Sequence, residues 1–135
     1  VGRAGLERNG KKKWRRHVAD VVERLKAQGF GVHSDIDVQA TLKAKLGADM
    51  PPYRILGACN PSFAHQALQI EDKLGVLLPC NVIVRETADR RVEVASVDPV
   101  VSMDRTGNAA LASTAEEVRR RLASVIEAVA SQPAR

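Results

Sequence analysis

Segments with the apolar spacing of a helix alternate with short apolar strands along almost the whole chain, and this order limits the fold more than any other feature. In the first helix, residues 14–28, the side chains of Trp14, Val18 and Leu25 fall on one stripe. Four strands interspersed with helices predict an α+β fold, a two-layer sandwich in which helices pack on a largely antiparallel sheet. The expected elements are helix 14–28, strand 30–36, helix 38–46, strand 53–59, helix 61–72, strands 81–86 and 91–97, and helix 113–129.

Turn and capping residues indicate where these elements begin and end. Residues 88–90 form a predicted turn, so the strands on either side are expected to make a hairpin. Asp37 is the predicted N-cap of the second helix, and residues 113–116 have the spacing of a capping box that opens the last helix. Pro79 lies in the apolar run 76–85 and indicates a sheet edge, a bulge or a strand that begins near Cys80.

Positive charge is concentrated at the N-terminus. Residues 1–16 hold seven basic residues and one acid, and the other 119 residues hold 14 basic and 15 acidic residues. We therefore expect a flexible basic arm at 1–13, a single domain at 14–130 and a frayed C-terminus at 131–135. The arm is a candidate for weak, salt-dependent association with nucleic acid, although a solvated terminus explains it more simply. Four aromatic residues are few for a surface that stacks bases.

The sequence also bears on the compartment. No apolar run approaches the roughly 20 residues that span a bilayer, so no membrane association is expected. Residues 1–16 lack the apolar core of a signal peptide, and two cysteines cannot build a disulfide framework, which together favour the cytoplasm. The chain begins with Val, as expected of a processed product or a segment cut from a longer chain.

Two Cys-Asn pairs lie at predicted strand ends. Cys59 ends one strand just before Asn60-Pro61, where Pro61 suits the first position of a helix and Asn60 is expected to cap its free N–H groups. A thiol there lies at the positive end of the helix dipole, which favours thiolate. Cys80-Asn81 begins another strand, and if the two strands are neighbours both pairs can line one pocket. The candidate ligand-binding residues are Cys59, Asn60, Pro61, His65, Cys80 and Asn81.

These residues leave several functions open. One is a small binding or sensing pocket, which includes a polar site for a small anion. Another is thiol chemistry in which Cys59 is the nucleophile and His65 its base. A third is a soft-metal site for zinc or copper(I) built from Cys59, Cys80 and His65, which lacks an evident fourth ligand. Against all three stands a simpler interpretation: buried cysteines behave as small core residues, and the asparagines cap a helix and make a turn.

Complete catalytic motifs are absent from the sequence. It contains no GxSxG, P-loop, GxGxxG or HExxH pattern, so we predict no cofactor and do not expect an enzyme. Asp35 and Asp37 resemble a paired-carboxylate site, although a helix cap explains Asp37 more simply.

Several short motifs occur here in the order typical of one known family. They are residues 28–32 (QGFGV), 35–38 (DIDV), 55–61 (ILGACNP), 64–68 (AHQAL), 77–82 (LLPCNV) and 97–99 (VDP). On these motifs, residues 16–128 resemble the domain of unknown function 302 (DUF302) family of bacteria and archaea.

The resemblance implies a compact two-layer α+β domain with a sheet of four or five strands, and homodimers. Family members often begin with a strand before the first helix, but the basic arm of this chain does not have a strand pattern. The family has no established enzymatic activity. We therefore rank a homodimeric binding or sensing domain first, thiol redox or metal chemistry second, and nucleic-acid association through the arm third.

Overall fold

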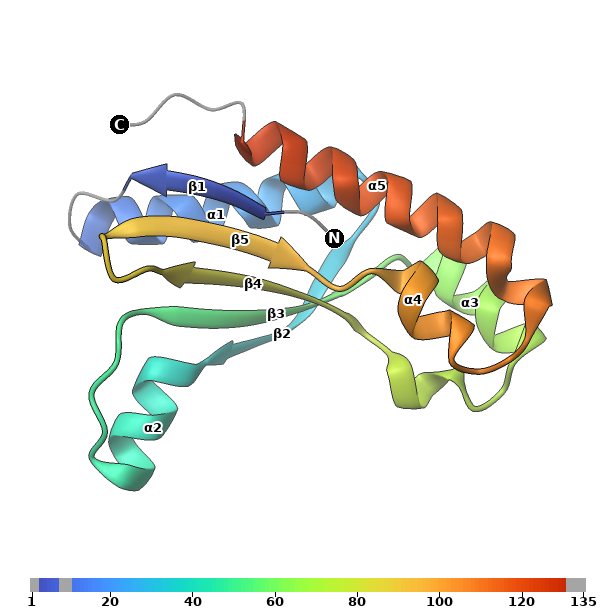
Figure 1. Cartoon of the computed structure of the whole chain (residues 1–135), viewed down its shortest axis with the longest axis horizontal. Helices are drawn as coiled ribbons and strands as arrows, with labels where there is room; N and C mark the ends of the chain where they lie inside the picture. Colours follow the sequence, from blue (N-terminus) through green and yellow to red (C-terminus); the bar gives the residue numbers. More distant parts are fainter. Residues whose placement is uncertain (1–2, 8–10, 131–135) are drawn as a thin grey trace.

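The computed structural model describes residues 3–7 and 11–130 of the chain (Figure 1). It has the α+β architecture that the sequence predicts. In chain order its elements are β1 (Arg3–Glu7), α1 (Lys11–Ala27), β2 (Gly31–Asp37), α2 (Val38–Leu46), β3 (Tyr53–Cys59), α3 (Pro61–Ile70), the 3-10 helix η1 (Leu74–Leu77), β4 (Cys80–Glu86), β5 (Arg91–Ser96), α4 (Pro99–Asp104), the 3-10 helix η2 (Ala109–Leu111) and α5 (Ala112–Ala130).

The five strands form one antiparallel sheet with the order β1-β5-β4-β3-β2. The predicted hairpin is confirmed, because β4 and β5 pair directly across the turn at residues 88–90. β3 and β4 are also neighbours, with Leu56 opposite Val82 and Ala58 opposite Cys80. The two strands that carry the Cys-Asn pairs therefore lie side by side.

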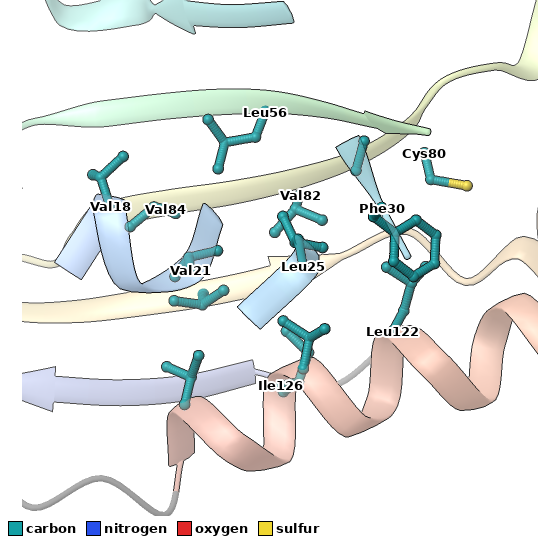
Figure 2. Close-up of a cluster of buried hydrophobic side chains, with 14 of the residues drawn as sticks. Val18, Val21, Leu25, Phe30, Leu56, Cys80, Val82, Val84, Leu122 and Ile126 are labelled. Carbon is teal, nitrogen blue, oxygen red and sulfur yellow. The ribbon is translucent and has the colours of Figure 1, made fainter. Parts of the chain in front are cut away.

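Helices α1 and α5 cover one face of the sheet (Figure 1). Figure 2 shows the side chains between these layers, which come from α1, from β3 and β4, and from α5. The apolar stripe predicted for the first helix is buried there. Removing apolar side chains from water is favourable, so this face of α1 packs against the sheet. The labelled core side chains include Val18, Val21, Leu25, Phe30, Leu56, Val82, Val84, Leu122 and Ile126.

The N-terminus differs from the sequence-based prediction. Residues Arg3–Glu7 form the edge strand β1 beside β5, and Lys11 to Lys13 belong to α1, so a basic arm without a strand is wrong for these residues. The segment has only one large apolar residue, Leu6, and therefore lacks the alternation that marks a strand. The exposed edge of β5 supplies its hydrogen-bonding partner instead. The predictions for residues 1–2, 8–10 and 131–135 lie outside the described residues.

Three predicted element boundaries can be compared with the structure. Asp37 caps α2 as expected, since its Oδ1 accepts a hydrogen bond from the Ala40 N–H at 2.9 Å. β4 begins at Cys80, after η1, so Pro79 lies just before the strand, which is the third of its three interpretations. The capping box at residues 113–116 is wrong: Asn108 caps η2 by accepting from the Ala110 N–H, and the chain continues from η2 into α5.

Candidate functional site

A pocket opens at the end of the sheet where β3 ends and β4 begins. α3, α4 and α5 complete its wall, so it lies beside the main core. Its volume is about 360 Å³ when the part open to solvent is included, and the space that a water-sized molecule can occupy is about 30 Å³. Because a water needs roughly 10–15 Å³ by this measure, that space holds about two water-sized groups. Three residues of the Cys-Asn pairs, Cys59, Asn60 and Cys80, meet in this wall.

The wall of the pocket carries almost no charge. Most of its described lining is apolar, including Phe63, Met103 and Val118, and its only ionisable side chains are the two thiols. An unpaired charge moved from water into such a site costs far more than an uncharged group does. The described lining therefore offers no cationic side chain to offset the charge of a small anion.

The two cysteines differ in exposure. Cys80 is buried beside Phe30 at the end of the core (Figure 2), and Cys59 is only half-buried. Burial and, to a smaller extent, the nearby Cys59 together raise the pKa of the Cys80 thiol to about 11. Cys80 therefore stays protonated at neutral pH, and Cys59 is the more accessible of the two sulfur atoms.

Asn60 occupies the N-cap position of α3, but its side chain does not cap the helix, so this part of the prediction is wrong. The side chain turns toward the α1–β2 turn, where its Nδ2 lies 3.5 Å from the Gln28 carbonyl oxygen. Gly29 leaves room for it, because a Cβ atom at this glycine would lie 2.9 Å from the same Nδ2. Arg121 donates to the Gln28 carbonyl at 3.1 Å and lies over the Phe63 ring. Asn60 thus joins two chain segments at the pocket wall.

The other predicted site residues lie away from the pocket. Asn81 is exposed, because it follows Cys80 in a regular strand and neighbouring side chains point to opposite faces. His65 and Pro61 are exposed on α3 and do not line the pocket. Within residues 3–7 and 11–130, no three His, Cys, Asp or Glu side chains are grouped closely enough to hold a metal ion. Cys59, Cys80 and His65 therefore do not form a joint metal centre.

Thr114 is a polar pocket residue that sequence reasoning missed. It is only 8% exposed and lines the pocket. The predicted capping box had assigned it to the opening of the last helix. The structure places it inside α5 because the helical segment starts earlier, at the Asn108 cap.

The paired carboxylates also have structural partners. Asp35 forms a two-bond ion pair with Arg54, with distances of 2.8 Å and 2.6 Å. The hydrogen bonds from Arg54 lower the pKa of Asp35, and Asp37 caps α2. These contacts account for both acids without a catalytic role.

The fold and the pocket together define a small α+β domain with a narrow, nearly uncharged cavity at one end of an antiparallel sheet. The chain belongs to the DUF302 family, a domain of unknown function, whose family model matches residues 7–129. Its fold is similar to the crystal structure of an uncharacterized conserved DUF302 protein from Bacillus stearothermophilus. The TM-score is 0.83 and the sequence identity is 25%, over 93% of this chain and 94% of that chain.

A search among curated proteins found no match. In the part of the chain that the structure describes, every helix is too short or too polar to cross a bilayer.

Proposed function

We propose that this chain is a small binding or sensing domain whose pocket takes a small, uncharged and mainly apolar molecule. The observation that carries the proposal is the composition of the pocket wall: apolar side chains, two thiols, one amide and one hydroxyl. Ligand sites are typically concave and apolar, with a few polar groups that fix the orientation of the guest. Cys59, Asn60 and Thr114 supply such groups here.

The size of the cavity limits the ligand further. The space open to water-sized groups accepts about two of them, and the rest of a larger guest would extend toward solvent. A nucleotide or a large cofactor is therefore a poor fit, both in volume and in charge. We include in the proposal a cytoplasmic location, which free cysteines favour, and the homodimer that the family resemblance implies.

Backbone-amide NMR with a set of small uncharged molecules tests this proposal. Binding in the pocket should shift the amide resonances of Phe63, Thr114 and Val118 more than those of the exposed surface. Ala64→Leu should abolish these shifts, because Ala64 lines the pocket and the larger side chain fills it. Gln66→Leu is the matched control, since it adds the same side chain at an exposed position of α3.

Two results would contradict the pocket assignment. One is that no molecule in the set shifts the pocket amides. The other is that Ala64→Leu binds as well as the Gln66→Leu control.

A further inference from the structure

Two side chains that can donate hydrogen bonds, Asn60 and Thr114, line the pocket. Thr114 is only 8% exposed. Asn60 is 9% exposed, and its one hydrogen bond, to Gln28, has the long distance of 3.5 Å. Hydroxyl and amide groups both donate hydrogen bonds, so an acceptor oxygen on the guest complements the polar groups of this otherwise apolar wall. The guest is therefore expected to carry an acceptor oxygen.

The first turn of α3 strengthens this expectation. Cys59 immediately precedes the helix, and the Asn60 side chain leaves its first N–H groups uncapped. Phe63 and Ala64 bring this turn into the pocket wall. Uncapped N–H groups and the helix dipole favour negative charge that develops on an atom beside them. The pocket can thus stabilise an oxygen that gains electron density.

Cys59 lines the same pocket and is half-buried there. The other thiol, Cys80, is enclosed in the core and stays protonated at neutral pH. Cys59 is therefore the accessible nucleophile beside the acceptor-binding groups. The combination of a thiol with donors for an oxygen matches an uncharged carbonyl compound.

We propose, building on the function above, that the ligand is a small neutral aldehyde and that Cys59 adds to it reversibly. The Cys59 sulfur forms a bond to the carbonyl carbon, the carbon–oxygen π bond breaks, and its electron pair moves to oxygen. The thiol proton ends on that oxygen, which gives a hemithioacetal. Nothing is oxidised or reduced, and no leaving group or co-reactant is needed. A carboxylic acid would bring a charge into the pocket, and an amide is too weak an electrophile.

Propanal labelled with carbon-13 at the carbonyl carbon is the probe. The expected result is a new NMR signal from a tetrahedral carbon bonded to sulfur and oxygen, in the wild type and in Cys80→Ala. The signal should be absent from Cys59→Ala, which keeps the lysines that also react with aldehydes. Thr114→Val should lower the adduct population about three- to tenfold, the effect of one hydrogen bond. Thr114→Ser should restore it, because serine keeps the hydroxyl.

Propan-1-ol separates the failure of this inference from the failure of the proposed function. It has nearly the same size as propanal but cannot react with a thiol. If both molecules shift the Thr114 and Val118 amides and no signal depends on Cys59, the covalent step is wrong and the binding pocket stands. If neither molecule shifts them, both proposals are wrong. An adduct no more stable than that of N-acetylcysteine would show ordinary thiol chemistry and would also overturn the inference.

Discussion

The two Cys-Asn pairs of this chain have the same sequence and different surroundings. In the first pair both residues line the pocket, and Cys59 is half-buried there. In the second pair Cys80 lines the pocket but is buried, and Asn81 is exposed on the opposite face of the sheet. The difference follows from the position of each pair in its strand. Cys80-Asn81 begins a regular strand, where successive side chains alternate between faces. At Cys59-Asn60 the strand ends and α3 begins, so the alternation stops.

This comparison shows that a repeated dipeptide does not predict a repeated role. What matters is whether the backbone continues in the same conformation past the pair. It also separates the two sulfur atoms, because burial raises the pKa of the Cys80 thiol, whereas Cys59 is the more accessible sulfur.

The largest expected effect comes from placing a carboxyl group at each cysteine. Cys80→Asp should lower the free energy of unfolding by about 3 kcal/mol, because it buries a polar group without a partner. Cys59→Asp should cost less than about 1 kcal/mol, since the site is half-buried and lies at the positive end of α3. Urea denaturation followed by circular dichroism measures both. Equal losses of stability in the two variants would contradict the assigned difference in burial between the two cysteines.

Most of the architecture was predictable because its signals are local. The helical stripe of α1, the β4–β5 turn and the Asp37 cap each depend on a few neighbouring residues. β1 was not predictable in this way, because Arg3–Glu7 has no alternation of its own and depends on the edge of β5. The start of α5 was misplaced because the capping-box spacing at residues 113–116 is not used. Asn108 caps the 3-10 helix η2 instead, and the chain continues from η2 into α5.

The candidate site was predicted only in part. The meeting of Cys59, Asn60 and Cys80 follows from two apolar strands that happen to be neighbours. The placement of Asn81 outside the pocket could have been deduced from strand alternation alone. Thr114 could not have been found, because its role depends on how α5 packs against the end of the sheet.

A pH dependence should sharpen the comparison of the thiols. The pKa of Cys80 is about 11 in the folded protein, against an ordinary value of 9.0. Below pH 9 the thiol is protonated in both states and its contribution to stability is constant. Between pH 9 and 11 the unfolded chain loses this proton first, so stability falls as pH rises, by about 2–3 kcal/mol in total.

Urea denaturation between pH 8 and pH 11.5 measures this effect as a difference between variants. The wild type and Cys59→Ala should show the decline, and Cys80→Ala should lack that part of it. Other groups that titrate in this range, lysines and the single tyrosine, are common to all three proteins. An identical decline in Cys80→Ala would mean that the buried thiol does not cause it.

The smallest expected effect concerns the two asparagines. Asn60→Ala should destabilise the protein by about 1 kcal/mol, because it removes the contact between the Asn60 side chain and the Gln28 carbonyl and leaves space beside Gly29. Part of that carbonyl's bonding survives, since Arg121 still donates to it at 3.1 Å. Asn81→Ala should change stability by less than about 0.5 kcal/mol, as is usual at an exposed site without a partner in the core. Thermal unfolding resolves this difference, and a larger loss for Asn81→Ala than for Asn60→Ala would contradict the structural roles assigned to the two asparagines.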